Sequence, residues 1–256
     1  MSKILLPLMV LLCVATHSNA NTAVVHGNRF LGSSTDDARD KAMGLVTRAF
    51  AQELTRRIEL PMAEVNCPFV RCITSLFNGS VDFVFLLSVK DERRAGMDFV
   101  QVWPGNIKVI FMLPSGRGHT IQSYDDLLGK RLGVVRGYAY FSKLDSDTRI
   151  NREVVVAPQQ LPKLLKAGRI DAFASYGHLE QDILARYPGF ESAPFSGRYG
   201  ELGFLAVSKK SPLQERLPEL NKAVLEMIKD GTLDAILDMY LPGERLPYPP
   251  ELGPER

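Results

Sequence analysis

The sequence predicts an α/β protein built from two similar lobes. Helix-like and strand-like segments alternate through most of the chain, which is typical of this class. The phrase Leu-x-x-Gly-x-x-Asp occurs at residues 76–82 and again at 165–171, each time with a helical segment before it and a strand-like run after it. A third copy, at residues 228–234, leads into more helix, so the spacing by itself is weak evidence. The prediction depends on the two copies together with the alternation.

Composition restricts the function classes. The 256 residues suffice for one large or two modest domains, and 45% hydrophobic content fits a globular protein with a buried core. The net charge of +2, with no basic stripe interleaved with aromatic residues, argues against a nucleic-acid partner. We therefore expect no nucleic-acid partner. A monomeric protein is also expected.

The first twenty residues differ from the rest. Lys3 precedes an apolar stretch at residues 4–15, and small residues end at Ala20, which is the pattern of a cleaved secretory signal. The stretch is too short to span a bilayer comfortably, although an uncleaved N-terminal anchor is an alternative. Residues 1–20 are thus predicted to be a signal peptide, with an exported mature chain that starts near Asn21.

Removal of the signal peptide removes Cys13 and leaves Cys67 and Cys72. An even cysteine count in an exported protein favours a disulfide, here at the start of a short helix. The alternative is two free thiols too far apart to bridge. No histidine pair stands nearby at metal-ligand spacing, so we expect no metal, and nothing else in the sequence predicts a cofactor.

The N-terminal half contains three predicted strands. They cover residues 23–30, 58–65 and 81–87, with a long helix from Asp36 or Asp37 to about Arg57 and a second helix at residues 69–77. Gly79 follows that helix at the position of a left-handed cap. The strand at 81–87 is almost wholly apolar, as in a parallel strand covered on both faces. The loop after it is therefore a candidate ligand site.

The remaining elements continue the alternation. Strands are predicted at residues 106–113, 131–136, 154–156, 170–174 and 203–208, and a helix is predicted to open at Gly137, where helix-terminal amides would meet an anion. Further helices cover residues 162–167 and 177–187 and two segments ending near Tyr240, before an extended proline-rich tail. The first lobe is predicted to comprise residues 21–111 and 203–256, and the second lobe residues 112–202. Two crossover strands would act as the hinge.

The chain resembles the family 3 extracellular solute-binding proteins. These proteins have a two-lobed type II periplasmic binding fold and serve mostly in the uptake of polar amino acids. The resemblance covers nearly the whole mature chain. It rests on the order and spacing of the motifs at residues 76–82, 91–93, 98–99, 124–130 and 168–172. It implies a periplasmic location and an interlobe cleft that closes on a small molecule.

The resemblance implies roles for several first-lobe residues. Arg93 matches the arginine that grips the ligand carboxylate, for which a guanidinium offers a planar fork of donors. Ser88 matches a hydroxyl residue that contacts the same carboxylate, and Phe69 matches an aromatic wall. Phe30 could oppose Phe69, with core packing as the alternative. Arg93 could instead be a solvated surface arginine, and Ser88 an ordinary serine at the end of a strand. For Phe69 the alternative is core packing.

The second lobe is expected to contribute Arg136, Gly137 and Tyr138. They lie at a strand-to-helix turn, where backbone amides and a basic side chain usually meet the ligand in this family. For Arg136 the alternative is an ordinary surface position. Many amino-acid binders carry an acid for the ligand ammonium where this sequence has Tyr176, and Glu180 could substitute. The glycine expected two residues before Ser88 is a leucine. Amino-acid specificity therefore does not follow from the resemblance.

We interpret the chain as a non-enzymatic binding protein that delivers a small polar or anionic solute to an inner-membrane ABC permease or reports it to a sensor. An enzyme on the same fold, similar to cyclohexadienyl dehydratases, is the second interpretation, and His178 and Glu180 are its candidate acids. No acid–base pair with telling spacing supports it. A degenerate lobe pair used for protein interaction is the third.

Overall fold

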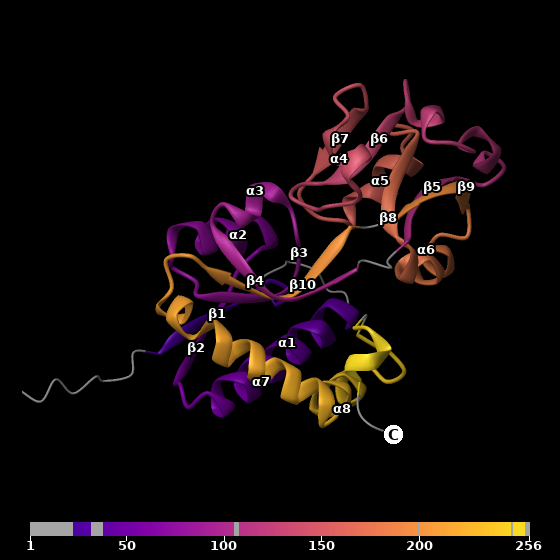
Figure 1. Cartoon of the computed structure of the whole chain (residues 1–256). Helices are drawn as coiled ribbons and strands as arrows, with labels where there is room; N and C mark the ends of the chain where they lie inside the picture. Colours follow the sequence, from indigo (N-terminus) through magenta and orange to yellow (C-terminus); the bar gives the residue numbers. More distant parts are fainter. Residues whose placement is uncertain (1–22, 32–37, 105–107, 199, 247, 254–256) are drawn as a thin grey trace, which may run out of the picture.

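The computed structural model describes residues 23–31, 38–104, 108–198, 200–246 and 248–253, so the predicted signal peptide lies outside the described residues. Figure 1 shows two lobes, each built on a sheet with helices packed against it. The predicted α/β fold of two lobes is confirmed.

The sheet of the first lobe has the strand order β2-β1-β3-β10-β4. Strands β1, β2 and β3 run parallel, whereas β10 is antiparallel to both β3 and β4. All six residues of β3 are buried, as expected for a strand covered on both faces. The strands are β1 (Val24–Asn28), β2 (Met62–Asn66), β3 (Phe83–Ser88), β4 (Met97–Pro104) and β10 (Glu201–Ser208).

The sheet of the second lobe repeats this plan in the order β7-β6-β8-β5-β9. Strand β6 is parallel to β7 and β8, and β5 is antiparallel to β8 and β9. Strand β9 has no counterpart among the predicted strands, because its residues alternate irregularly between buried and accessible positions. The strands are β5 (Lys108–Pro114), β6 (Arg131–Val135), β7 (Asn151–Val155), β8 (Ala172–Tyr176) and β9 (Phe190–Arg198).

Helices cover both faces of the first sheet (Figure 1). In α1, Val46, Phe50 and Leu54 are buried one turn apart, which is the stripe that faces the core. Among the described residues, no helix is both long and apolar enough to cross a membrane. The α-helices are α1 (Ala38–Arg57), α2 (Phe69–Asn78), α3 (Asp91–Arg94), α4 (Ser142–Ser146), α5 (Gln160–Lys166), α6 (Glu180–Arg186), α7 (Leu217–Lys229) and α8 (Thr232–Tyr240).

The chain passes between the two sheets twice, from β4 to β5 and from β9 to β10. The lobe limits predicted at 111/112 and 202/203 fall inside β5 and β10, yet β5 pairs only within the second sheet and β10 only within the first. Each predicted limit therefore lies inside a strand of the sheet that the chain has already joined. Hydrophobic patterning locates a strand but does not tell which sheet it joins.

The repeated phrase has the same structural role in each lobe. Gly79 ends α2 with φ 82°, and Gly168 follows α5 with φ 65°, both in the left-handed region. Each phrase ends in an aspartate whose carboxylate accepts a backbone N–H of the neighbouring strand segment: Asp82 from Val25 at 2.6 Å, and Asp171 from Arg131 at 2.8 Å. The phrase thus ends a helix and aligns the strand that follows.

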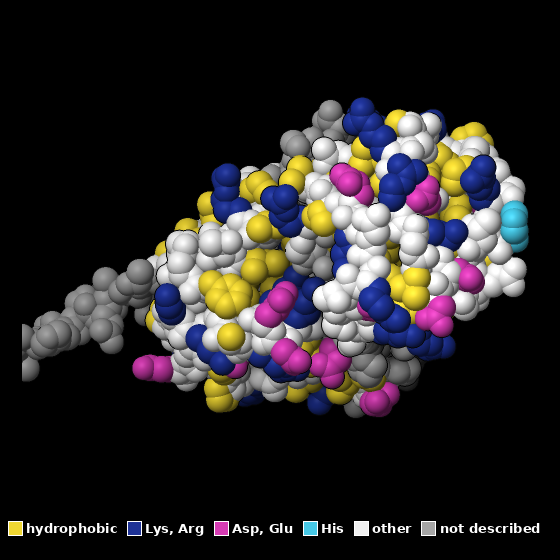
Figure 2. All heavy atoms as spheres, turned by 90° about the horizontal axis from the view of Figure 1, so that it is seen from above, with side chains coloured by type: hydrophobic (Ala, Val, Ile, Leu, Met, Phe, Trp, Pro, Cys, Tyr) yellow, Lys and Arg dark blue, Asp and Glu magenta, His cyan; other side chains and the backbone are white. Residues whose placement is uncertain are grey.

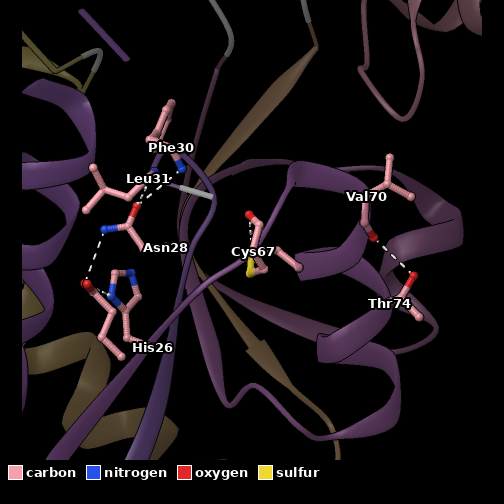
Figure 3. The surroundings of a disulfide bond; sticks show 9 residues. His26, Asn28, Phe30, Leu31, Cys67, Val70 and Thr74 are labelled. Carbon is pink, nitrogen blue, oxygen red and sulfur yellow. Dashed lines mark hydrogen bonds and ion pairs between the residues drawn. A yellow bond between two sulfur atoms is a disulfide. The ribbon is translucent and has the colours of Figure 1, made fainter. Parts of the chain in front are cut away.

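The predicted disulfide between Cys67 and Cys72 is present, with the two Cα atoms 5.3 Å apart and both residues buried. It joins the segment after β2 to the first turn of α2. Figure 3 places Cys67 across from the end of β1, where the Cys67 N–H donates to the Asn28 carbonyl at 3.2 Å. Closing so short a loop is worth about 2 kcal/mol of stability in the chain-entropy model, and it holds the start of α2 in place.

Two local predictions differ from the structure. No helix opens at Gly137: the residue has φ 78°, and α4 begins only at Ser142. The Tyr140 N–H donates instead to the Asp145 carboxylate, so the segment is a loop. The proline-rich tail was expected to be extended, but its described part packs on the first lobe, where Tyr248 contacts Trp103 at 5.9 Å between ring centroids.

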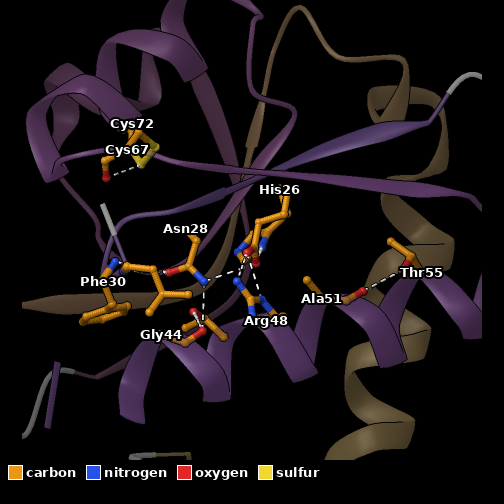
Figure 4. Close-up of polar contacts among 12 residues, drawn as sticks. His26, Asn28, Phe30, Gly44, Arg48, Ala51, Thr55, Cys67 and Cys72 are labelled. Carbon is orange, nitrogen blue, oxygen red and sulfur yellow. Dashed lines mark hydrogen bonds and ion pairs between the residues drawn. A yellow bond between two sulfur atoms is a disulfide. The ribbon is translucent and has the colours of Figure 1, made fainter. Parts of the chain in front are cut away.

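A buried polar centre joins β1, β2 and α1. His26 is fully buried and stacks on Phe83, and its Nδ1 lies 3.3 Å from the Glu64 carboxylate. Arg48 and Asn28 also donate to Glu64, and Figure 4 shows them converging with His26. Burial lowers the pKa of His26, although the Glu64 hydrogen bond opposes the change. Burial alone would raise the pKa of Glu64, but hydrogen bonds from His26, Arg48 and Asn28 lower it to about 2.

These shifts predict loss of stability on acidification. The pKa of His26 is lower in the folded state than its usual 6.5. The contribution of neutral His26 to the free energy of unfolding is therefore fully present above pH 6.5 and is lost as the pH falls below that value. Glu64 stays ionised in this window. Between pH 7 and pH 5 the free energy of unfolding should fall by about 1–2 kcal/mol through His26. Urea unfolding of wild type and His26→Gln at both pH values measures this. The exposed His119→Gln is the control, and an equal pH dependence in all three proteins would contradict the prediction.

Candidate ligand-binding site

A cavity of about 430 Å³ lies between the two lobes, within the range of small-molecule sites. Both lobes contribute to its walls, and the segment after α8 closes one side. The first lobe provides Arg29, Phe30, Phe69, Leu86 and Ser88, and the second provides Tyr138, Tyr140, Ser175, Tyr176 and His178.

The Arg93 guanidinium links the two lobes beside this cavity. Arg93 lies on α3, at the C-terminal end of β3, and is only 2% exposed. Its Nη1 donates to the Ser88 carbonyl at 2.8 Å and to the Ser88 hydroxyl. Its Nη2 donates to the Gly137 carbonyl of the second lobe at 2.5 Å. One buried cation therefore donates hydrogen bonds to acceptors in both lobes.

Further contacts surround this link. The Lys90 ammonium lies 3.3 Å from the Tyr138 carbonyl and 3.7 Å from the Asp145 carboxylate. Burial raises the pKa of Asp145, and the charge of Lys90 opposes the rise. A methyl group added at Gly137 would lie 3.3 Å from atoms of both Phe69 and Val70. The lobes are therefore in direct contact at the start of α2 and α3.

Aromatic rings form a row along the cavity. Phe69 meets Tyr138 edge to face at 5.2 Å between centroids, Tyr138 stacks near Tyr176 at 5.9 Å, and Tyr176 stacks near His178 at 5.9 Å. The Tyr176 hydroxyl donates to the Ala139 carbonyl at 2.8 Å. The second-lobe wall is therefore aromatic where an acid would be expected in an amino-acid binder.

The structure brings most of the predicted site residues together. Phe69, Ser88, Tyr138 and Tyr176 line the cavity, and so does Phe30. Arg93 and Gly137 are outside the cavity lining but are bonded to each other beside it. The two remaining candidates lie elsewhere: Arg136 is exposed and outside the lining, and Glu180 accepts a hydrogen bond from the Ser192 hydroxyl.

Sequence reasoning missed several charged residues of the cavity. Arg29 stands directly before Phe30 at the end of β1, so its position was a usable signal. The others come from distant parts of the chain, on α1, on α6 and after α8, and only tertiary structure brings them together. They are Arg39, Asp40, Asp182, Arg186, Glu244 and Arg245.

Charges of both signs are mixed around the cleft. Arg39 and Glu244 form an ion pair. The hydrogen bond from Arg39 lowers the pKa of Glu244, whereas burial alone would raise it. On the face shown in Figure 2, basic side chains are scattered among acidic and polar ones. Among the described residues, no cluster of His, Cys, Asp or Glu has the geometry of a metal site.

Comparison with known proteins identifies the family. The model of the bacterial extracellular solute-binding proteins, family 3, matches residues 28–243. The chain belongs to this family. It is 26% identical over 195 residues to the L-cystine-binding protein TcyJ of Escherichia coli K12, covering 75% of this chain and 71% of that protein. The same values hold for TcyJ of Escherichia coli O6:H1.

Solved structures share the fold at lower identity. An ancestral arginine-binding protein bound to arginine aligns with a TM-score of 0.64 at 23% identity, over 86% of this chain and 98% of that one. A periplasmic His/Glu/Gln/Arg/opine family-binding protein from Silicibacter pomeroyi in complex with lysine gives a TM-score of 0.66 at 15% identity, over 88% and 100%. The fold is therefore that of the two-lobed periplasmic amino-acid-binding proteins.

Removal of the Arg93 guanidinium should loosen the contact between the lobes. Arg93→Ala leaves the Gly137 carbonyl and the Ser88 groups without this donor, so the unliganded protein should become less compact. Small-angle X-ray scattering should show a larger radius of gyration than for wild type. Arg94→Ala is the matched control, because the neighbouring Arg94 is exposed and contacts Glu201 within its own lobe. Equal radii for all three proteins would show that Arg93 does not hold the lobes together.

Proposed function

We propose that the protein is a periplasmic, monomeric solute-binding protein that captures a small polar or anionic molecule, amino-acid-like or an organic acid, between its lobes. The observation that carries the proposal is the cavity bounded by both lobes with the Arg93 guanidinium joining them beside it. A ligand that contacts both walls favours the closed form, because its affinity for that form is higher. The family and the cystine-binding relatives support an extracytoplasmic binding role.

In this proposal the chain carries out no catalysis. The family relatives identified above are named as binding proteins. Bound solute would be delivered to an inner-membrane ABC permease or reported to a sensor. His178 lines the cavity, but its ring stacks near Tyr176 and the Glu180 carboxylate is engaged by Ser192, so these two groups form no acid–base pair.

A thermal-shift screen tests the proposal. Amino acids, organic acids and small peptides are the panel, and a ligand at 100 times its dissociation constant should stabilise the mature protein by about 2.7 kcal/mol. Arg93→Ala should weaken ligand binding by about 1–3 kcal/mol, because the closed form that binds the ligand loses the hydrogen bond that joins its two lobes. Calorimetry with the ligand found measures this, with Arg94→Ala as the control. A wild-type protein that responds to no solute on the panel would refute the proposal.

The second-lobe wall further defines the proposed ligand. A buried ammonium needs an acceptor, and a charged acceptor is strongly preferred. At the position where an acid is common, Tyr176 donates its hydroxyl proton to the Ala139 carbonyl, and Glu180 is bonded to Ser192. We therefore propose a ligand with an anionic or polar head and no obligatory α-ammonium, stacked against Tyr176.

A comparison of each L-amino acid with its deaminated analogue tests this point. The analogue should bind about as tightly as the amino acid, since Tyr176 offers no negative charge to an ammonium and the Glu180 carboxylate is bonded to Ser192. Isothermal calorimetry on wild type and Glu180→Gln measures both affinities. If the amino acid binds much more tightly and Glu180→Gln removes the difference, then Glu180 turns into the cleft and recognises the ammonium, and the proposal is wrong.

A further inference from the structure

The first-lobe end of the cavity carries a positive charge held between two aromatic rings. The Cζ atom of Arg29 lies 4.0 Å from the ring centroid of Phe30 and 5.1 Å from that of Phe69. Both rings line the cavity, and so does Arg29. A guanidinium at these distances interacts favourably with aromatic faces. The protein thus places its own cation on the two rings that the cleft offers at this end.

A hydrogen bond to a strained backbone position fixes this arginine. Its Nη2 donates to the Leu86 carbonyl at 2.9 Å. Leu86 has φ 55°, a left-handed conformation that is unfavourable for a branched side chain, and it is buried within β3. The carbonyl that holds Arg29 therefore belongs to a residue kept in an uncommon conformation by its surroundings. Arg29 is a fixed part of the wall.

The charge of Arg29 acts across the cleft. Burial raises the pKa of Tyr138 in the second lobe, and the positive charge of Arg29 opposes that rise, whereas Asp40 adds to it. Three acids also line the cavity: Asp40 on α1, Asp182 on α6 and Glu244, which is paired with Arg39. A ligand group that reaches Phe30 and Phe69 therefore meets a guanidinium already stacked there.

We propose that Arg29 is a specificity-determining residue that selects ligands with an anionic or neutral group at the Phe30–Phe69 end of the cleft and excludes ligands with a guanidinium or ammonium there. The inference rests on the proposed binding function and specifies its ligand class. Two effects act together: the aromatic faces are already occupied, and like charges in a partly desolvated site repel. Arginine- and lysine-bound proteins share this fold, but the cleft of this chain opposes their ligands.

Matched ligand pairs test the assignment. L-Citrulline is the neutral counterpart of L-arginine, and L-glutamine is the neutral counterpart of L-glutamate. Wild type should bind citrulline more tightly than arginine. Arg29→Met removes the charge and frees both rings, so the ratio of the two dissociation constants should shift toward arginine by about tenfold or more. The preference for glutamate relative to glutamine should fall in the same variant. Calorimetry and thermal shift measure both ratios.

Three further variants separate charge from structure. Arg29→Lys keeps the charge and should keep the exclusion of arginine. Arg71→Met makes the same charge change at an exposed position of α2, outside the cavity lining, and should keep the wild-type ratios. Arg29→Gln, which retains a donor for the Leu86 carbonyl, takes the place of Arg29→Met if that protein does not fold.

The outcomes distinguish this inference from the proposed function. If wild type binds a solute but prefers arginine to citrulline, or if Arg29→Met leaves both ratios unchanged, only the role of Arg29 is overturned. If wild type responds to no solute but Arg29→Met gains arginine binding, the role of Arg29 stands and the proposed ligand class of the native cleft falls. If neither protein binds any member of either pair, the assignment of Arg29 is overturned.

Discussion

The arrangement of the two lobes depends on one buried cation. A guanidinium that is 2% exposed must find acceptors, because a buried charge without partners is costly. Arg93 takes those acceptors from Ser88 in the first lobe and from the Gly137 carbonyl in the second. The same bonds that satisfy the charge therefore bring α3 against the loop after β6. The cavity is the space left between the lobes beside this contact.

The scaffold places the cleft residues through short, rigid links. The disulfide between Cys67 and Cys72 holds the first turn of α2, where Phe69 lies, and Asp82 aligns the start of β3, which ends at Ser88. In the second lobe Asp171 aligns β8, which ends at Tyr176. Asp82 and Asp171 therefore hold corresponding strands, and each strand ends at a wall of the cavity in its own lobe.

Two strands of the first sheet each hold a non-glycine residue in the left-handed backbone region. Leu86 in β3 and Gln101 in β4 both have positive φ, at 55° and 51°, on the two strands that flank β10. A non-glycine residue in this region costs roughly 1–2 kcal/mol. At Leu86 the conformation directs the carbonyl to Arg29, a wall residue of the cavity. Strain of this kind persists where the surrounding structure determines the backbone.

Local chemistry in the sequence determined the class of fold, the ends of the helices before Gly79 and Gly168, the disulfide and several of the cavity's aromatic residues. Gly79 and Gly168 end their helices because only glycine adopts positive φ freely, and such signals act within a few residues. The sequence did not reveal the loop at Gly137, the packed tail, or the place of Arg29 between two rings. Those features depend on contacts between residues far apart in the chain, such as Arg29 with Phe69 and Arg93 with Gly137. Only the tertiary structure decided them, because a side chain's charge and partners are set by what folding brings beside it.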